Sequence, residues 1–343
     1  MRQVIMVRPY ELEVVELPQP VPGPGETLVE TRVCGICTLE QRVYRGIRNQ
    51  YPFRAGHEVS GIVKEVNACS SIEPGDKVAV SLVPRCGSCA YCKAGHDNLC
   101  SYFTASRSTG ELWGPGGLSD YMIVREQDAF PVSTKVTFDT AALVEPIACC
   151  LHSLRRANAL AGKVLAVVGT GFFGLLHVGL ANSLGLRTVA LSLPNDPPIA
   201  KDIRSLPKHV YGMVADLATT RSVLENLDVP GVDICVCTRG GNAAFEAALL
   251  ITRPGGTVVV FESMYGGQQL NVAFEKLRSR ELTVTASLSH TRSDFAEAAR
   301  LVSSGRLGID ALVLRAFPFN DIEAAMRYAV ASPRGRTMVH FGG

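Results

Sequence analysis

The chain has 343 residues, of which 47% are hydrophobic and 19% are charged, a composition typical of a soluble globular protein with ample apolar material for a core. This length suggests two domains. The net charge is only +2, from 34 basic and 32 acidic side chains, which gives no reason to expect nucleic acid or an anionic membrane as a partner.

The first residues do not read as a secretory signal, because Pro9, Glu11, Glu13 and Glu16 interrupt them before a long apolar core develops. We therefore expect a cytoplasmic protein in a reducing compartment. The chain has 11 cysteines, an odd number, and four of them lie in one loop. In such a compartment disulfides are not expected, and close cysteine spacing indicates metal binding or catalysis.

The first chemical signal lies at residues 29–46, where a strand-like run ends at Cys34-Gly35-Ile36-Cys37. Residues 55–63, AGHEVSGIV, then present His57 and Glu58 just before a β-branched run. A cysteine, a histidine and a carboxylate make a mixed set of three metal ligands, which leaves a fourth position for water or substrate. Taken singly, these residues also have a purely structural interpretation, in which Cys34 is a small buried residue and His57 a structural histidine.

The strongest metal signal is the loop CGSCAYCKAGHDNLC, whose spacing is Cys86-x2-Cys89-x2-Cys92-x7-Cys100. Four thiolates close a tetrahedral shell around Zn²⁺ and leave no open position, so we expect a structural site. The zinc would replace a hydrophobic core in a small lobe at residues 84–101. An iron–sulfur cluster and free thiols are the alternatives. The bacterial ferredoxin run has a shorter last gap followed by proline, which this loop lacks.

Residues 162–192 predict a strand, a turn, a helix and a second strand. Val164 to Val168 form an unbroken apolar run, as in a parallel strand buried on both faces. Gly169-x-Gly171-x-x-Gly174 follows directly. In a dinucleotide-binding fold such glycines permit the tight turn, the approach of a pyrophosphate and close helix–strand packing. The pyrophosphate would lie at the start of the helix, near Phe172 and Phe173, where free N–H groups favour anions.

The same stretch is apolar enough to pass for a membrane span, but a buried strand followed by a buried helix explains its hydropathy better. The second strand, TVALS, ends at Ser192, 23 residues after Gly169. An NAD enzyme usually has Asp or Glu there for the ribose 2′-hydroxyl. Ser192 does not repel a 2′-phosphate, yet no arginine follows it directly, and Lys201 and Arg204 are either phosphate partners or surface charges. The cofactor is therefore NAD or NADP.

In their order along the chain, these motifs resemble those of the zinc-dependent medium-chain alcohol and polyol dehydrogenases, in particular the branch of the sorbitol and threonine dehydrogenases. The resemblance runs from about residue 1 to residue 341. It rests on GIC with an acidic residue three positions on, GHE, the four-cysteine loop, GPGGLSDY at 114–121, EP at 145–146, the glycine motif, and PGGTVVV at 254–260. It implies an α/β protein in which a discontinuous, β-rich, GroES-like catalytic domain flanks a Rossmann domain with a doubly wound parallel sheet.

The resemblance implies a catalytic domain at 1–149, a Rossmann domain at 150–287 and a return to the catalytic domain at 288–343. The end of the chain fits such a return, because ALVLRAF and RTMVHF read as strands. Between them a helix is expected, entered from Asn320 as its cap. Its apolar face would consist of Ile322, Ala325, Met326, Ala329 and Val330.

Residue by residue, the resemblance implies that Cys37 and His57 are the first two ligands of a catalytic zinc. The third ligand is a cysteine in the alcohol dehydrogenases proper, and a glutamate from the GHE or the EP motif in the polyol-type enzymes. Glu58 and Glu145 occupy those two positions here, so a glutamate-type site is expected. Glu40 stands where the family has an aspartate that partners the ligand histidine, and it would orient His57.

One position departs from the family. Two residues after the first ligand the family commonly has Ser or Thr, the first member of a proton relay, but this chain has Leu39 there and Thr38 one position early. The proton would then leave through Thr38, through a water near Glu40 or Glu58, or through a hydroxyl of the substrate. The last route favours polyhydroxylated substrates.

The activity implied by the resemblance is hydride transfer between NAD or NADP and a small secondary alcohol, such as a polyol, cyclitol, sugar-derived alcohol or amino-alcohol, with the ketone as the other partner. A homo-oligomer, dimer or tetramer, is expected, without nucleic acid or membrane. Two alternatives are a zinc-free quinone reductase, which would need neither Cys37, His57 nor the cysteine loop, and a relative with altered or lost activity, which Leu39 favours.

Overall fold

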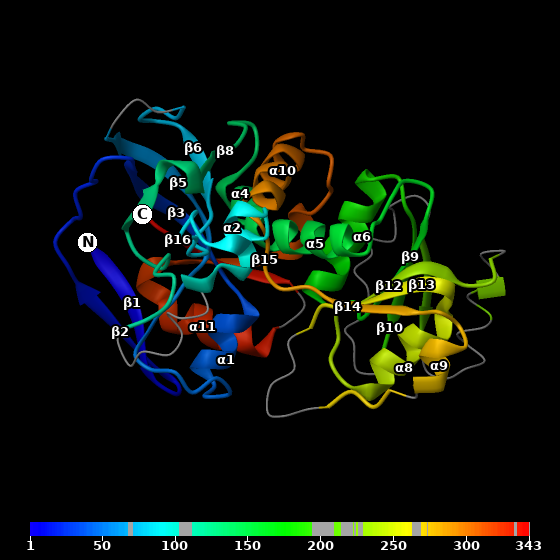
Figure 1. The fold of residues 1–343 in the computed structure, drawn as a ribbon. Coiled ribbons are helices and arrows are strands. Elements are labelled where there is room, and N and C mark those ends of the chain that lie inside the picture. The colour runs from blue at the N-terminus through cyan, green and yellow to red at the C-terminus, as the bar shows by residue number, and fades with distance from the viewer. Residues whose placement is uncertain are drawn as a thin grey trace. The chain divides into compact units, whose positions relative to one another are not determined.

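The computed structural model describes residues 1–67, 71–102, 112–193, 209–213, 222, 224–225, 229–262, 269–272, 274–332 and 335–342. The chain forms two compact units. The first unit consists of Met1–Ala148, His290–Arg306 and Asp310–Gly343, and the second of Cys149–Ser289 and Leu307–Ile309. The chain thus leaves the first unit, builds the second and returns, which the colours of Figure 1 let the reader follow.

The first unit is built on two sheets. Within the described ranges the larger has seven strands, in the order β15-β16-β3-β5-β6-β8 with β7 beside β3. They are β3 (Glu26–Ile36), β5 (Glu58–Val66), β6 (Lys77–Val80), β7 (Tyr121–Arg125), β8 (Ala129–Pro131), β15 (Val313–Pro318) and β16 (Arg336–His340). The smaller sheet has the order β2-β1-β4, from β1 (Arg2–Arg8), β2 (Glu11–Glu16) and β4 (Phe53–Arg54).

Strand β3 runs through the middle of the larger sheet and sets the register of the candidate site. Gly35, near its end, pairs with Glu58 of β5 on one side and with Met338 of β16 on the other. Three segments that are far apart in the sequence therefore meet just before Cys37. A Cβ atom at Gly35 would collide with the Glu58 carboxylate and lie 3.3 Å from the Arg336 side chain, so the missing side chain leaves room for that pair.

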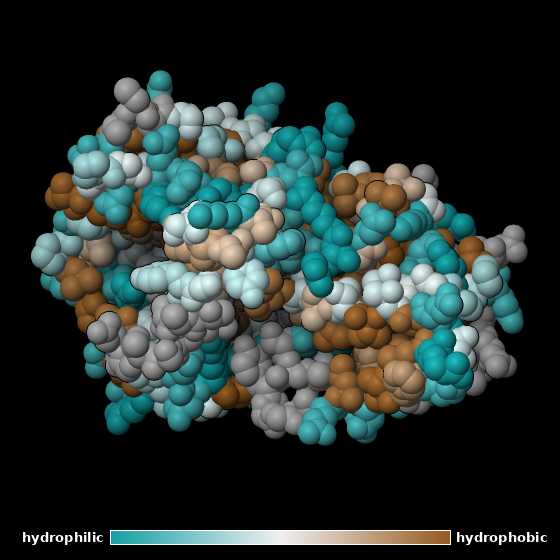
Figure 2. Space-filling view, in the orientation of Figure 1, coloured by the Kyte–Doolittle hydropathy of each residue, from teal (hydrophilic) through white to brown (hydrophobic). Residues whose placement is uncertain are grey.

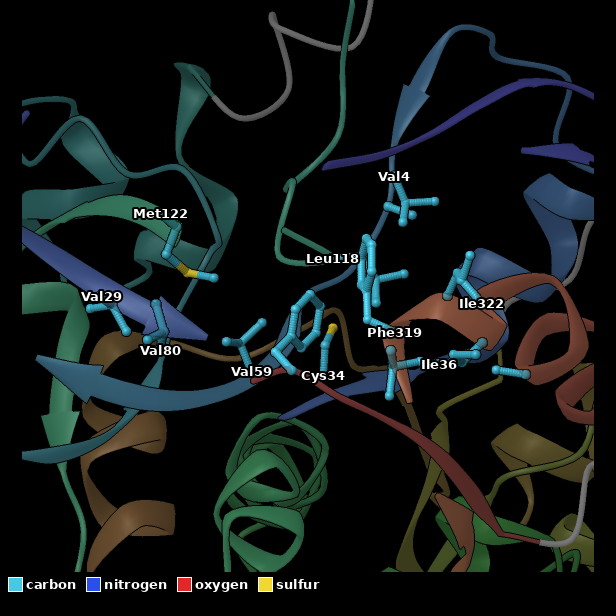
Figure 3. Close-up of a cluster of buried hydrophobic side chains, with 14 of the residues drawn as sticks. Val4, Val29, Cys34, Ile36, Val59, Val80, Leu118, Met122, Phe319 and Ile322 are labelled. Carbon is cyan, nitrogen blue, oxygen red and sulfur yellow. The ribbon is translucent and has the colours of Figure 1, made fainter. Parts of the chain in front are cut away.

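A large apolar cluster lies in the first unit. Figure 3 shows part of it, with Cys34 lying between side chains such as Val59 and Ile36. Cys34 is fully buried, and burial raises the pKa of its thiol well above the ordinary value. A neutral thiol in such surroundings behaves as a small hydrophobic group.

Among the described residues, the helices of the first unit are α1 (Thr38–Tyr44), α2 (Ala90–Lys93), α4 (Phe138–Ala142), α10 (Arg292–Ser303) and α11 (Ile322–Ala331), and α5 (Val144–Arg156) begins in it. Helix α11 buries the face that its sequence period predicts. The predicted cap was wrong, because Asp321 and not Asn320 occupies the N-cap position. A 3₁₀ turn precedes the helix, and the Asn320 side chain accepts instead from Arg2 Nη1 at 2.9 Å.

The second unit contains a parallel sheet. Its six described strands have the order β11-β10-β9-β12-β13-β14, which places β9 in the interior of the sheet, the doubly wound arrangement of the Rossmann fold. The strands are β9 (Val164–Val168), β10 (Arg187–Ser192), β11 (His209–Met213), β12 (Val232–Cys237), β13 (Thr252–Val260) and β14 (Thr283–Ala286). Helices α6 (Phe172–Ser183), α8 (Asn242–Ile251) and α9 (Phe274–Arg278) belong to this unit.

The apolar stretch from Val164 is the strand β9 followed by α6. All five residues of β9 are buried, as a strand covered on both faces requires. Helix α6 buries most of its residues as well. In the part of the chain that the structure describes, no helix has the length and hydropathy needed to cross a membrane.

Candidate active site and metal centres

Cys37 lies between the end of β3 and the start of α1, where it is the N-cap residue. Its sulfur accepts from the backbone N–H of Glu40, and Glu40 Oε2 accepts from the backbone N–H of Cys37 at 3.2 Å. This reciprocal pair satisfies N–H groups that a helix start otherwise leaves unpaired, and it fixes both side chains. Burial raises the pKa of the Cys37 thiol, although Arg336 and His57 act against that rise.

Glu40 holds the imidazole of His57. Glu40 is fully buried, and its Oε1 lies 2.9 Å from His57 Nδ1 and accepts from the Gly56 backbone N–H at 3.1 Å. Burial alone would raise the pKa of Glu40, but His57 and the backbone donors lower it. Burial also opposes a charge on His57, yet Glu40 and Cys37 raise its pKa well above the ordinary value. With Nδ1 held by a carboxylate, Nε2 is the nitrogen left for a metal.

Glu58 forms a buried ion pair with Arg336, which follows it by most of the chain's length. Arg336 Nη2 lies 2.6 Å from Glu58 Oε1, and both side chains are at most 2% exposed. Arg336 Nη1 also donates to the Ile36 carbonyl at 3.2 Å, and Nη2 contacts Cys37 Sγ at 3.8 Å. Burial raises the pKa of Glu58 to about 7 although Arg336 and His57 favour its charged form. Burial therefore disfavours the charged form of Glu58 more than Arg336 favours it.

Glu145 lies at the start of α5 and is only 7% exposed. One side-chain oxygen of Glu145, one of Glu58 and one ring nitrogen of His57 lie within 4.8 Å of one another. Cys37, Glu40 and His57 form a second group with the same closeness. The structure thus gathers the predicted catalytic-site ligands around His57. Glu145 Oε1 also lies 3.6 Å from Nε2 of the buried His290.

This donor set fits zinc. It offers a sulfur, an imidazole nitrogen and carboxylate oxygens, which are the ligand types of catalytic zinc sites. Neither oxygen of the buried Glu58 has a hydrogen-bond partner within the described residues, because its contact with Arg336 is not aligned as a hydrogen bond. Carboxylates buried without full compensation are costly, and a divalent cation beside His57 would neutralise them.

Leu39, which stands where the family commonly has Ser or Thr, has apolar surroundings in the structure. Leu39 lies in the first turn of α1 and packs, partly buried, against the core of the first unit. Thr38 precedes it as the first residue of α1 and is half-buried. A leucine has no donor or acceptor and cannot take part in proton transfer. Thr38 is the hydroxyl-bearing side chain nearest in sequence to Cys37.

The four-cysteine loop also converges. The sulfurs of Cys86, Cys89, Cys92 and Cys100 lie within 4.8 Å of one another. Backbone N–H groups of the loop donate to these sulfurs, among them that of Cys89 to Cys86 Sγ at 3.3 Å, and such bonds lower the pKa of Cys86 to about 6. Burial and the neighbouring sulfurs raise the pKa of Cys92 to about 12. Four sulfurs that lie this close together fit a closed shell around Zn²⁺.

Replacing Cys92 by serine should lower the melting temperature by about 5–10 °C, the effect of about 2–3 kcal/mol in a domain of this size. The change opens the zinc shell, and α2 beside it has no buried residue to take over. Differential scanning fluorimetry and metal analysis check this, with the half-buried Cys149 as the matched Cys→Ser control. Unchanged melting and full zinc content in the Cys92 variant would contradict a structural zinc.

The glycine motif of the second unit forms the turn between β9 and α6. Gly169 has φ +102°, a conformation that side chains rarely adopt, and a Cβ at Gly174 would collide with the Gly169 carbonyl. Gly171 is the N-cap of α6, and a Cβ there would meet nothing within 4 Å. Phe172 and Phe173 form the first turn of α6. This arrangement fits a dinucleotide, whose pyrophosphate binds at the N–H groups of such a helix start.

Ser192 ends β10, and its hydroxyl lies 2.8 Å from that of Thr170. Ser192 and Thr170 lie, like the glycine turn, at the carboxyl ends of the parallel strands β10 and β9. A ribose would be bound at this end of the sheet. Lys201 and Arg204 lie outside the described residues, so their proposed contact with a 2′-phosphate stays a prediction.

Sequence reasoning missed Arg336 and His290. Both lie more than 100 residues from the groups that they contact, Arg336 at Glu58 and His290 at Glu145. Arg336 opens the last strand and reads from the sequence as an ordinary charge at a strand start. His290 precedes α10 and has no motif around it. Spatial proximity alone reveals their role.

Comparison with known proteins agrees with this geometry. Residues 23–134 match the model of the alcohol dehydrogenase GroES-like domain, and residues 209–335 match that of the zinc-binding dehydrogenases. A probable D-xylulose reductase A of Emericella nidulans is 27% identical over 321 residues, 90% of this chain and 88% of that protein. A sorbitol dehydrogenase of Halalkalibacterium halodurans is 26% identical over 319 residues, 91% and 90% of the two chains.

Solved structures give the same result. A putative zinc-binding dehydrogenase from Sinorhizobium meliloti 1021, bound to NADP, superposes with a TM-score of 0.84 at 26% identity, over 99% of this chain and 98% of that one. The two matched domain models lie on either side of the glycine turn, and the predicted α/β architecture is confirmed. The chain belongs to the zinc-dependent medium-chain alcohol and polyol dehydrogenases.

Proposed function

We propose that the protein interconverts a polyhydroxylated secondary alcohol and its ketone, with NAD or NADP as hydride carrier and zinc at the Cys37–His57 cluster. The cluster itself is the observation that carries the proposal. A buried sulfur, an imidazole and two carboxylates gather in the first unit, while the second unit carries the glycine turn of a dinucleotide-binding fold. The relatives named as xylulose reductase and sorbitol dehydrogenase support a polyol as substrate.

When bound, the zinc would act as a Lewis acid on the substrate oxygen, and the nicotinamide would accept the hydride. The residues of the chain prepare this chemistry. Cys37, His57 and Glu145 would hold the metal. Glu40 fixes His57 through Nδ1 at 2.9 Å and thereby aims Nε2. Arg336 Nη2 lies 2.6 Å from Oε1 of the second carboxylate, that of Glu58. Glu58 therefore stays beside the metal position, and Glu145 is the proposed ligand because Glu58 is already paired.

The missing relay hydroxyl points to the substrate class. Leu39 cannot pass on the alcohol proton, so a neighbouring hydroxyl of the substrate supplies the path that the side chain lacks. A polyol or cyclitol has such a hydroxyl, and ethanol does not.

We therefore expect a polyol, cyclitol or sugar-derived alcohol to be oxidised with at least about tenfold higher kcat/KM than ethanol or propanol, which corresponds to about 1.4 kcal/mol of barrier. A panel of both classes, measured at one pH with NAD and with NADP, checks this. Equal or better turnover of simple alcohols contradicts the substrate argument. Absence of hydride transfer with every alcohol, in protein that holds two zinc ions, favours instead a relative with altered or lost activity.

Zinc content provides a second check of the proposal. The two ligand sets predict about two zinc ions per chain. Replacing Cys37 by alanine should remove one of them and leave the zinc of the cysteine loop. Protein that carries a single zinc before and after this change would refute a catalytic metal at Cys37.

The proposal includes a homo-oligomer in the cytoplasm. Strand β14 is an edge strand, since β13 is its single neighbour among the described strands. Val284 of β14, Leu250 of α8 and Phe274 of α9 are exposed apolar side chains of the second unit. Figure 2 shows hydrophobic residues gathered at the lower right, over the region where Figure 1 draws α8, α9 and β14. An open edge with apolar flanks is suited to pairing with a second copy, which light scattering would detect.

A further inference from the structure

A chain of buried polar contacts leads from the four-cysteine lobe to Glu145. It begins at Asp97, which lies inside the lobe between Cys92 and Cys100. It continues through Arg85, the residue directly before Cys86, and through His290, and it ends at Glu145. All four residues belong to the first unit, and the role proposed for Glu145 gives none of the other three a function.

Arg85 is the centre of this chain. Its side chain is fully buried, and Nε lies 3.2 Å from Asp97 Oδ1. Nη1 donates to Ser81 Oγ at 2.9 Å and to the Val83 carbonyl at 3.2 Å. Nη2 donates to the His290 carbonyl at 3.0 Å and lies 3.2 Å from His290 Nδ1. A guanidinium held from several sides has one orientation, because its donors form a rigid fork.

Asp97 is held as firmly as the arginine that it contacts. Its carboxylate accepts from the backbone N–H of Arg292, at the start of α10, with distances of 3.1 and 3.3 Å to the two oxygens. The Arg292 side chain in turn contacts Asp128 at 2.9 Å. Through the bond between Asp97 and the Arg292 N–H, the lobe is connected to the start of α10. His290 lies two residues before Arg292 and belongs to the same segment.

The contact with Arg85 determines where His290 carries its proton. An arginine can only donate, so Nδ1 of the ring accepts from Nη2, and the proton of a neutral ring is on Nε2. The Thr291 carbonyl, 3.3 Å from Nδ1, would favour the other tautomer, but the charged donor of Arg85 gives the stronger bond. Nε2 lies 3.6 Å from Glu145 Oε1, which is longer than a hydrogen bond, so its N–H is a nearby donor to a predicted zinc ligand and not yet a bonded one.

We propose that Arg85 and His290 are positioning residues that join the cysteine lobe to the catalytic metal site. Asp97 orients Arg85, Arg85 fixes the tautomer of His290, and the Nε2–H of His290 orients the Glu145 carboxylate. This inference rests on the proposed function in so far as Glu145 is taken as a zinc ligand. The zinc of the lobe then stabilises more than its own loop, because it maintains the geometry of a ligand of the second metal.

The test compares two replacements of His290. His290→Phe keeps a ring that can pack against Phe295, whose ring centroid lies 5.0 Å away, but it removes both nitrogens. His290→Gln keeps an acceptor for Arg85 and a donor for Glu145. We expect the Phe variant to lose the catalytic zinc to a chelator at least about tenfold faster than the unchanged protein, the usual size of such effects, and the Gln variant to recover most of the loss. Metal analysis beside the Cys37→Ala variant identifies which ion leaves.

The second arm changes the lobe end. Asp97→Asn leaves all four cysteines in place, so the lobe should keep its zinc while the catalytic zinc dissociates faster. Asp120→Asn is the matched control, since Asp120 pairs with Arg2 in the same unit at 2.9 Å and has no contact with this chain of residues. His177→Phe is the control for loss of a buried histidine, because His177 contacts Ser153 and Phe173 of the second unit.

Wild-type metal retention in His290→Phe or in Asp97→Asn would overturn the proposal. Equal losses in His290→Phe and His290→Gln would overturn it as well, because ring shape rather than hydrogen bonding would then hold the site. Metal retention is measured without a turnover assay. Protein that keeps two zinc ions but oxidises no alcohol would therefore refute the proposed function and leave this coupling open to the same measurement.

Discussion

Replacing Glu145 by alanine should lower kcat/KM for the alcohol by at least about 1000-fold, or about 4 kcal/mol of barrier, and leave the fold intact. Side-chain oxygens of both Glu145 and Glu58 lie within 4.8 Å of a ring nitrogen of His57, but Glu58 is already paired with Arg336 at 2.6 Å. Loss of the Glu145 carboxylate therefore leaves the metal with one ligand fewer. Steady-state kinetics, zinc content and circular dichroism of the variant measure activity, metal and fold separately.

The matched comparison is Glu58→Gln, which removes a charge from the same cluster and keeps the size of the side chain. We expect a smaller loss of zinc and activity than in Glu145→Ala. The reverse order, with zinc lost from Glu58→Gln and retained in Glu145→Ala, would assign the third ligand to Glu58.

Replacing Arg336 by methionine should lower the free energy of unfolding by about 3–5 kcal/mol, the range observed when one partner of a buried ion pair is removed. Arg336 is 1% exposed and lies against the fully buried carboxylate of Glu58. Methionine fills a similar volume, so the loss reports the uncompensated carboxylate and not a cavity. Urea unfolding followed by circular dichroism gives the value, measured with and without zinc.

The double variant Arg336→Met with Glu58→Gln is the control. It removes both charges, so it should recover a large part of the stability lost in the single variant. If the two changes simply added, the ion pair would contribute nothing and the role assigned to Arg336 would be refuted.

Where the sequence carries local chemistry, its predictions are confirmed. The turn at Gly169 could be predicted because the tight turn and the close packing of Gly174 permit no side chain. This requirement appears in the sequence as glycines at fixed positions. The apolar run at Val164 gives the buried strand because burial on both faces requires apolar side chains throughout. The cap of α11 was misplaced by one residue, since the competing bond of Asn320 comes from Arg2, more than 300 residues earlier.

The predictions for the candidate site show the same difference between local motifs and contacts across long sequence separations. Cys37 and His57 belong to short motifs, so their place could be predicted, and the structure shows them within one cluster. Which of Glu58 and Glu145 is left for the metal depends on Arg336, and this pairing is created by the alignment of β3 with β5 and β16. No single segment of the sequence determines the register between strands that are so far apart. For the same reason His290 could not be connected with Glu145 in advance.

The pairing of β16 with β3 also has a consequence for biosynthesis. Arg336 follows Cys37 by 299 residues, and the whole second unit is translated between them. At roughly 5–20 residues per second, the ribosome makes Cys37 tens of seconds before it makes Arg336. During that interval the Glu58 carboxylate lacks its guanidinium and the edge of β3 lacks a neighbour. The nascent chain therefore passes through a stage in which the second unit is complete in sequence while the metal pocket still lacks Arg336, so the pocket is completed only after the last strand has been made.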